Sequence, residues 1–213
     1  MGVTMSRQLV EKISYTEVTK NISQAEYNQT QEEYLMSKSP EKYMISLPIR
    51  VLMFEGAQDS SPFTYYFYEE NEEDLFLIQR QREGSVVNKT RFSLTREQGR
   101  KILNGDYQFL LDSEEPMLNS LYFQFTVNQL HPIYKKECTR KIFHQNRFLD
   151  EIVDIYIVRT PYDSDVDFFA ESAGRLRAAN HSSLRRNTRQ YLNLSKPMMD
   201  LVNFQNSLIE QQK

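Results

Sequence analysis

Short segments in which apolar and polar residues alternate recur along much of the chain. They include FTYYFYE at 63–69, LFLIQRQR at 75–82, SVVNKTRFSL at 85–94 and IYKKECTRKIF at 133–143. Alternation is typical of β-strands, because successive side chains point to opposite faces of a sheet. The pattern predicts several strands, and Glu83-Gly84 between the second and third segments predicts the turn of a hairpin.

Helical signals lie between the groups of strands. Ser23 precedes the segment 24–36 and predicts a capped helix there. Thr95 and Gln98 form a capping-box pattern at the start of a second helix, and MLNSLYFQFTVNQL at 117–130 predicts a third. Strands, a helix pair, further strands and a terminal helix together predict an α+β fold with a mainly antiparallel sheet.

Composition describes an ordinary globular chain. Of the 213 residues, 39% are apolar and 26% are charged, and the net charge is −3. This balance argues against extensive disorder and against a basic nucleic-acid-binding protein. No run approaches the about 18 to 20 apolar residues of a membrane helix. The single cysteine, Cys138, fits a reducing compartment and predicts a buried structural thiol, so we expect a cytoplasmic protein.

The feature that composition does not explain is a set of cations on or beside predicted strands. Its members are Lys20, Arg80, Arg82, Lys89, Arg91, Arg140 and Arg159. Arg80 and Arg82 share one side of a strand, and Lys89 and Arg91 share one side of the next. Whether both pairs face the same way depends on the register of the turn, which the sequence leaves open.

Two structures accommodate such cations. One is an open sheet with a solvated basic face. The other is a barrel with cations inside, where charges are costly unless they are paired or bound to a ligand. Phosphate suits such an interior, because the arginine fork matches its oxygens and lysine supplies a compact charge.

Other catalytic patterns are absent. The chain has no G-x-x-x-x-G-K-[ST] loop and no G-x-G-x-x-G segment, and its three histidines show no metal-ligand spacing. The acidic segments ENEED at 70–74 and DSDVD at 163–167 lie in predicted turns or loops, where solvated carboxylates are more common than metal ligands.

A resemblance to a known family adds to this interpretation. KTRFSLTREQ at 89–98 followed by KILNGDYQFLL at 101–111 resembles the bacterial VTC-domain proteins, the polyphosphate polymerase branch of the CYTH-like triphosphate tunnel metalloenzymes. YTEVTKNISQAEY at 15–27 and VRTPYD at 158–163 resemble further family segments. The resemblance spans about residues 15–169 and is best over 65–143.

Several positions depart from the family pattern. An Arg-x-Arg strand of the family falls on Thr64 and Tyr66, and the glutamate of a Glu-x-Lys element falls on Ile78. Cys138 replaces the tyrosine of a Tyr-x-Arg element that retains Arg140. A late Glu-x-Lys strand, which supplies a metal-binding glutamate in the family, has no counterpart in this sequence.

The resemblance implies an antiparallel β-barrel of the triphosphate-tunnel type with flanking helices. Its basic interior would bind ATP or another nucleotide triphosphate, or polyphosphate, and transfer the terminal phosphoryl group of ATP to a polyphosphate chain with Mn²⁺ or Mg²⁺. The implied catalytic residues are Arg80, Lys89, Arg91, Arg140 and Arg159; the implied substrate-binding residues add Lys20 and Arg82, and Glu17 is the metal candidate.

Two alternatives remain open. One is a catalytically inactive phosphate-binding or regulatory module that kept the tunnel fold; the other is a structural or interaction protein without a phosphate site. Whether the protein is an enzyme is therefore undecided at this stage, and a protein partner is left open. Missing acidic metal ligands weaken catalysis more than binding, because transition-state charge must be met at particular positions.

The expected organisation is a flexible N-terminus at 1–12, a tunnel domain at 13–169 and a basic segment with a C-terminal helix at 170–213. The basic run 175–196 is expected to form a solvated helix, a polyanion clamp or a partly ordered arm, with the helix favoured. PMMDLVNFQNSLIEQQK at 197–213 predicts an amphipathic helix.

Overall fold

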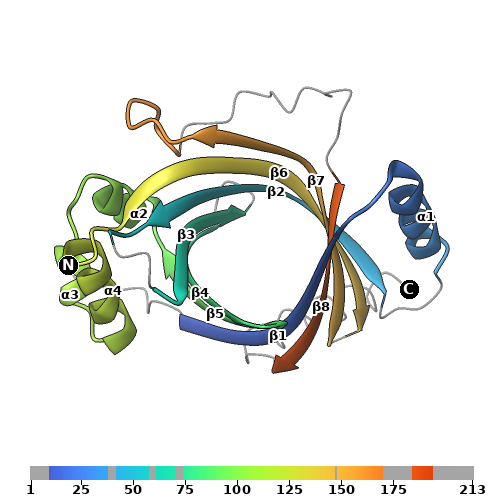
Figure 1. The fold of residues 1–213 in the computed structure, drawn as a ribbon, viewed down its shortest axis with the longest axis horizontal. Helices are drawn as coiled ribbons and strands as arrows, with labels where there is room; N and C mark the ends of the chain where they lie inside the picture. The colour runs from blue at the N-terminus through green and yellow to red at the C-terminus, as the bar shows by residue number, and fades with distance from the viewer. Residues whose placement is uncertain are drawn as a thin grey trace, which may run out of the picture.

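The computed structural model describes residues 10–37, 42–57, 61–70, 74–146, 148–169 and 184–193. Within these residues, eight strands pair antiparallel and close into a barrel (Figure 1). The strands are β1 (Val10–Asn21), β2 (Tyr43–Glu55), β3 (Phe63–Glu70), β4 (Asp74–Glu83), β5 (Val86–Leu94), β6 (His131–Asn146), β7 (Leu149–Pro161) and β8 (Leu184–Asn193). Their order around the barrel is β1-β5-β4-β3-β2-β6-β7-β8. The predicted antiparallel barrel with flanking helices is confirmed, and the open sheet is wrong.

Four helices flank the barrel in the described part of the chain: α1 (Gln24–Leu35), α2 (Arg96–Leu103), α3 (Gln108–Leu111) and α4 (Pro116–Thr126). The predicted cap at Ser23 and the predicted capping box at Thr95 are confirmed. Ser23 accepts from the backbone N–H of Glu26 at α1, and Thr95 accepts from that of Gln98 at α2. None of the described helices is long and apolar enough to cross a membrane.

The largest hydrophobic core lies outside the barrel wall. Helices α2, α3 and α4 gather on one side of the barrel (Figure 1) and pack against the outer faces of β2 to β5. Buried residues that build this core include Leu52, Phe67, Leu77, Phe92, Ile102, Leu110, Leu121 and Phe125. Because side chains alternate along each strand, the residues between these core positions face the barrel interior.

A second core attaches α1 to the opposite side of the barrel. Tyr27 and Tyr34 of α1 pack against Phe143 of β6, Val153 of β7 and Leu184 of β8. Two smaller apolar clusters, one around Ile49 and Ile78 and one around Ile13 and Val87, lie on the interior face, next to its charged and aromatic side chains.

The basic run contains the strand that closes the barrel. Residues 184–193 form β8, which pairs with β1 and β7, so the favoured solvated helix is wrong for these residues. The cations that suggested a solvated surface are paired instead: Arg189 with Glu17, and Arg186 with Glu151. The division of the chain at residue 170 stays a prediction, and the helix expected at 197–213 lies outside the described residues.

The N-terminal end of the expected tunnel domain differs in detail from the prediction. Strand β1 already begins at Val10, within the segment 1–12 that was expected to be flexible; residues 1–9 lie outside the described part. Strand β2 is continuous across Pro48, which lies opposite Thr139 of β6.

Candidate anion site in the barrel interior

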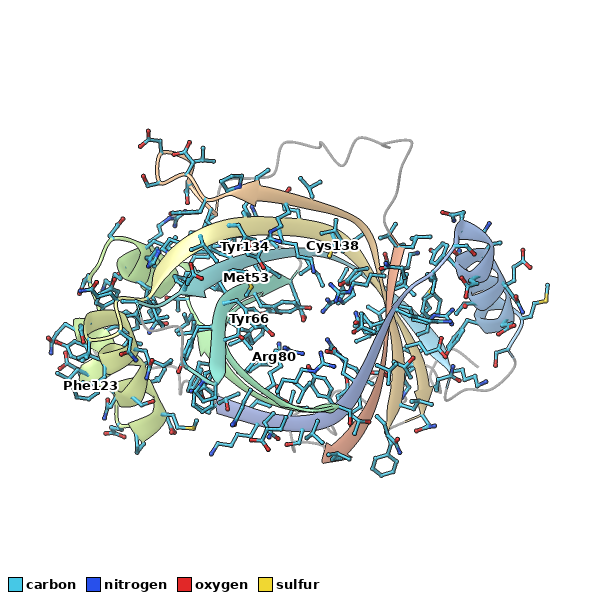
Figure 2. The ribbon with its side chains drawn as sticks, viewed as in Figure 1. Met53, Tyr66, Arg80, Phe123, Tyr134 and Cys138 are labelled. Atoms are coloured by element: carbon cyan, nitrogen blue, oxygen red, sulfur yellow. The ribbon has the colours of Figure 1, made fainter. Side chains whose placement is uncertain are left out.

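The β4–β5 hairpin places its cations on one face. Arg80 lies opposite Lys89 in the register. Arg82 and Arg91 are two residues away along their strands and therefore share that face. The turn is made possible by Gly84, whose φ of 61° is readily adopted only by glycine. This face is the interior one, and Figure 2 shows Arg80 and Tyr66 projecting from the wall into the ring of strands.

A carboxylate on β1 joins this hairpin to β8. Glu17 is 7% exposed, and each of its oxygens accepts from a different arginine. Arg80 Nη2 donates to Oε2 at 2.9 Å, and Arg189 Nε donates to Oε1 at 2.9 Å. Burial alone would raise the pKa of Glu17, but the charges and hydrogen bonds of Arg189 and Arg80 outweigh it, so the pKa lies below its ordinary value. Glu17 is therefore ionised at neutral pH.

A second ion pair links β6 and β7. Arg140 donates from Nε and Nη2 to the two oxygens of Asp154 at 2.6 and 2.9 Å, and from Nη1 to the hydroxyl of Tyr68 at 3.3 Å. Lys136 Nζ lies 3.8 Å from Asp154. Every nitrogen of the Arg140 guanidinium is thus engaged by the protein, so this arginine is held firmly in one orientation.

Arg91 is held by an aromatic ring and a carboxylate. Its guanidinium lies 3.7 Å from the centre of the Phe76 ring, and its Nε is 3.7 Å from Glu11. Stacking on an aromatic face is favourable for a guanidinium, because the ring carries partial negative charge on its faces.

Lys89 is different from these arginines. Its Nζ lies 5.2 Å from the centre of the Tyr68 ring, and it forms no ion pair with any described residue. Burial lowers the pKa of Lys89 well below its ordinary value of 10.5. Three neighbouring guanidinium groups lower this pKa further: Arg91, Arg189 and Arg140. The Glu70 carboxylate acts in the opposite direction but more weakly, so the surroundings of Lys89 are predominantly positive and would stabilise an anion.

The interior remains accessible to solvent despite these side chains. The exposed fractions of the side chains are 24% for Arg80, 20% for Arg91, 23% for Lys136, 12% for Arg140 and 14% for Arg189. These fractions show that the interior cations are partly exposed to solvent and not completely buried.

The structure brings together most of the predicted site residues but not all of them. Arg80, Lys89, Arg91 and Arg140 line the same interior. Arg82 faces it from near the turn and donates to the carbonyl of Gly84. Arg159 is exposed near the end of β7, with its guanidinium 3.7 Å from the centre of the Tyr134 ring. Lys20 lies apart on the outer face, 53% exposed and paired with Glu26 of α1 at 3.3 Å.

Two interior cations were missed by the sequence analysis, Lys136 and Arg189. The alternation of Asn187, Arg189 and Tyr191 was a usable strand signal, but the density of arginine around it favoured a solvated helix.

Mn²⁺ or Mg²⁺ is the cofactor that the family resemblance implies, but the residues do not fit it. Both oxygens of Glu17 are already bound by arginines, whose positive charges oppose a divalent cation. No group of three or more acidic, histidine or cysteine side chains that could hold a metal occurs in the part of the chain that the structure describes.

A further polar network lies between β6, β7 and β8. Asp150 is 6% exposed, and its two oxygens contact His144 Nδ1 at 2.8 Å and the hydroxyl of Tyr191 at 2.9 Å. The Tyr43 ring stacks on His144 with 4.5 Å between ring centres. These partners satisfy the buried carboxylate and brace the wall next to Arg189, which lies opposite Asp150 in the β7–β8 register.

Cys138 faces the same interior and is 2% exposed, as the prediction of a buried thiol requires. Burial raises its pKa to about 11. The thiol is therefore protonated at neutral pH, which does not suit a nucleophile.

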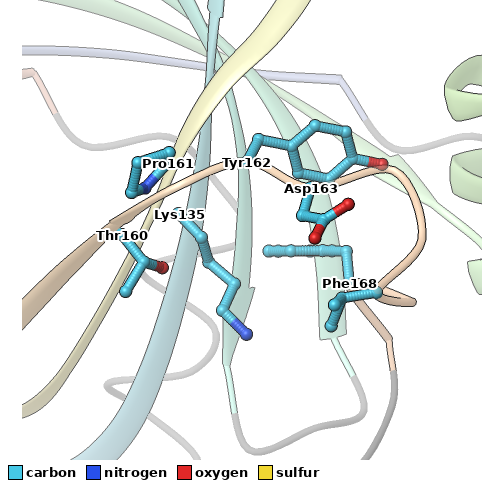
Figure 3. A pocket seen from close by; sticks show the side chains of 7 residues that line it. Lys135, Thr160, Pro161, Tyr162, Asp163 and Phe168 are labelled. Atoms are coloured by element: carbon cyan, nitrogen blue, oxygen red, sulfur yellow. The ribbon is translucent and has the colours of Figure 1, made fainter.

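A small pocket lies on the outer side of the wall (Figure 3). It has a volume of about 210 Å³ and is lined by Lys135, Thr160, Pro161, Tyr162, Asp163, Val166 and Phe168. Lys135 Nζ is 2.9 Å from Glu137 and so is already neutralised. The pocket contains one carboxylate of the DSDVD segment, which does not make a metal site.

No family model matches the chain, and no curated protein matches it in sequence. A comparison with solved structures finds several with a similar backbone fold. The Hippeastrum protein HpAC1, described as having a dominant triphosphatase activity, has a TM-score of 0.48 at 10% identity, over 97% of this chain and 88% of that one. The PH1819 protein from Pyrococcus horikoshii OT3 has a TM-score of 0.45 at 8% identity, over 92% and 89%. The RNA triphosphatase domain of a trifunctional mimivirus mRNA capping enzyme has a TM-score of 0.42 at 9% identity, over 94% and 89%.

Proposed function

We propose that the barrel interior binds a linear phosphate polyanion, either inorganic polyphosphate or the phosphate chain of a nucleoside triphosphate. The observation that carries this proposal is the position of Lys89. This lysine has no ion-pair partner among the described residues, and three guanidinium groups lower its pKa. An anion near Nζ would offset this repulsion and favour the charged form of the amine.

The shape and spacing of the cations favour a chain of phosphates over a single small anion. Arg80 and Lys89 lie opposite each other, Arg91 continues along β5, and Arg140 faces them from β6. Several phosphate oxygens can therefore be neutralised at once from different strands. Guanidinium and ammonium groups are the two side-chain cations best suited to phosphate oxygens.

Polyphosphate polymerase activity stays a prediction from the family resemblance. Moving a phosphoryl group requires charge neutralisation at particular positions, and in the family a divalent cation supplies part of it. The carboxylates of the described interior are taken up by arginine, histidine and tyrosine side chains. A binding or regulatory module is therefore the function that the geometry supports best, with phosphoryl transfer as the second candidate.

Thermal unfolding in the presence of tripolyphosphate tests the proposal. A ligand that binds only the folded state stabilises it by about 2.7 kcal/mol at a hundred times its dissociation constant. We expect a saturable rise of the unfolding temperature that sulfate at matched ionic strength does not reproduce.

Two lysine variants make the test specific. Lys89→Met should remove the response to tripolyphosphate, whereas Lys12→Met should keep it, because Lys12 is exposed on the outer face of β1. The absence of a phosphate-specific response in the unchanged protein, or an equal response of Lys89→Met, would show that the proposal is wrong. Turnover of ATP in the same samples would favour the second candidate.

A further inference from the structure

Arg189 is an interior arginine that is held by one nitrogen and keeps unused hydrogen-bonding capacity. Its Nε donates to Glu17, and its guanidinium lies 4.8 Å from the centre of the Tyr15 ring. Its two Nη groups form no hydrogen bond with any described residue. Arg140, by contrast, uses all three of its nitrogens on Asp154 and Tyr68. Arg189 is therefore oriented by the protein and retains a free pair of donors.

These free donors belong to the same electrostatic environment as Lys89. The charge of Arg189 is one of the causes of the low pKa of Lys89, so the two groups lie close enough to repel each other. Both face the barrel interior, Lys89 from β5 and Arg189 from β8, and β1 lies between these strands. Lys89 lies opposite Ile13 and Arg189 lies opposite Glu17, four positions further along β1, so an extended phosphate chain that follows β1 is the anion that would contact both.

Arg189 makes with Glu17 the kind of carboxylate contact that a divalent cation would make at a phosphate site. A divalent cation at a phosphate site contacts a protein carboxylate on one side and phosphate oxygens on the other. Arg189 contacts the carboxylate of Glu17 through Nε and leaves its Nη pair for an anion. Arg80 holds the second oxygen of Glu17, so the carboxylate has an arginine on each oxygen.

The two interior carboxylates of β7 offer no replacement for Glu17. Both oxygens of Asp154 accept from Arg140, and both oxygens of Asp150 contact His144 or Tyr191. A metal ion would have to break one of these arrangements before it could bind. Glu17, Asp154 and Asp150 are therefore all bound by side chains of the protein itself and are not free to ligate a metal ion.

From this geometry we infer that Arg189 takes the place of a divalent cation, so that the interior binds polyphosphate chains in their metal-free form. The inference rests on the proposed function and narrows it. It assigns to Arg189 a binding role that the sequence analysis did not give it, and to Glu17 the role of positioning Arg189 instead of ligating a metal.

Excess divalent cation should change the apparent affinity in opposite directions for metal-free binding and for metal-bridged binding. Mg²⁺ and Mn²⁺ form complexes with tripolyphosphate in solution and lower the concentration of the free chain. Excess divalent cation should therefore weaken apparent binding to this protein, whereas it would strengthen binding at a site that needs a metal bridge.

Isothermal titration of the full chain with tripolyphosphate tests this inference in EDTA and in excess Mn²⁺. We expect binding in EDTA and weaker apparent binding in Mn²⁺. In EDTA, Arg189→Gln should bind about tenfold or more weakly, because charge-assisted hydrogen bonds are lost. The matched control is Arg186→Gln on the same strand, whose side chain faces outward to Glu151 and Thr30 and whose loss should leave the dissociation constant within about threefold of the original.

The outcomes separate the inference from the proposed function. Binding that appears only with Mn²⁺ would overturn the role of Arg189 and leave the polyphosphate site standing. Unchanged affinity of Arg189→Gln in EDTA would overturn it as well. Absence of binding in both EDTA and Mn²⁺ would overturn the proposed function itself. The titrations of the unchanged protein in EDTA and in excess Mn²⁺ still decide the question if the Arg189→Gln chain does not fold.

Discussion

Arg80 of β4 lies directly opposite Lys89 of β5, with both side chains facing the barrel interior. Like charges in directly opposed positions destabilise a sheet. Glu17 relieves Arg80 at 2.9 Å, but no described carboxylate pairs with Lys89. The cost of the arrangement therefore falls mainly on Lys89, which is the property expected of a residue kept for a ligand.

Lys89→Met should make the ligand-free protein more stable. The substitution removes a desolvated charge opposite Arg80 and keeps the length of the side chain, so we expect the free energy of unfolding to rise by about 1 kcal/mol. Urea unfolding of both chains measures this difference. A loss of stability of similar size would mean that Lys89 makes a stabilising contact in the unliganded barrel.

The pH dependence of stability should differ between the same two chains. The pKa of Lys89 in the folded chain lies well below its ordinary value of 10.5. At a pH between the folded pKa and the unfolded pKa, the unfolded chain therefore binds a proton that the folded chain does not. The free energy of unfolding of the wild-type chain therefore rises with pH between these two pKa values. Below both values, both states are protonated and the destabilisation is fully present.

Unfolding free energies of the two chains at several pH values up to 10.5 provide the measurement. The advantage of Lys89→Met should shrink as the pH rises, and subtraction removes the contributions of tyrosines that titrate in both chains. An advantage that stays constant over the whole window would contradict a lowered pKa of Lys89.

How far the site could be predicted from sequence is clear from two strands. Alternation placed Arg80 with Arg82, and Lys89 with Arg91, on shared sides, because period 2 is a local property. Their common face depended on the two-residue turn that contains Gly84, and the chain gives no independent measure of that register. The structure supplies it through the Arg80–Lys89 pair.

Strand β8 shows what local sequence patterns could not predict. Its residues contain several arginines that in isolation favour a solvated surface, and only pairing with distant strands changes their environment. Arg189 meets Glu17, which is 172 positions away along the chain. A contact of this kind follows from barrel closure, so local patterns could predict a barrel and a basic interior but not the arginine that completes it.

Glu17→Gln should destabilise the protein, because it leaves Arg80 and Arg189 without their shared carboxylate. Removing one partner of a buried pair costs about 3 to 5 kcal/mol, and the partial exposure of both arginines reduces this to about 1 to 3 kcal/mol. Glu32→Gln on the exposed side of α1 is the matched control and should leave the free energy of unfolding unchanged.

The loss of stability in acid provides a second test of Glu17→Gln. The pKa of Glu17 is lowered in the folded state, so its contribution is present above its ordinary pKa of 4.5 and is lost as the pH falls through the folded value. Wild type should lose stability in this range and Glu17→Gln should lose less. Parallel acid profiles of the two chains would show that the pKa of Glu17 is the same in the folded and the unfolded chain, which would contradict its two arginine contacts.

The Cys138 thiol should resist alkylation in the native protein. It is 2% exposed, and burial raises its pKa to about 11, so very little thiolate is present at pH 8. Iodoacetamide should modify it rapidly in urea and slowly without urea, as mass spectrometry would record. Rapid modification of the folded chain would mean that the reagent reaches Cys138 in the barrel interior, which contradicts its burial.

Lys20→Met tests the one predicted site residue that lies on the outer face. Lys20 is 53% exposed and pairs with Glu26, so it is separated from the interior by the barrel wall. We expect its tripolyphosphate response to match that of the unchanged protein, whereas Lys89→Met loses the response. If Lys20→Met also weakened binding, the ligand would have to reach the outer face near the start of α1. The comparison of these two lysines therefore decides whether the polyanion occupies the interior of the barrel or its surface.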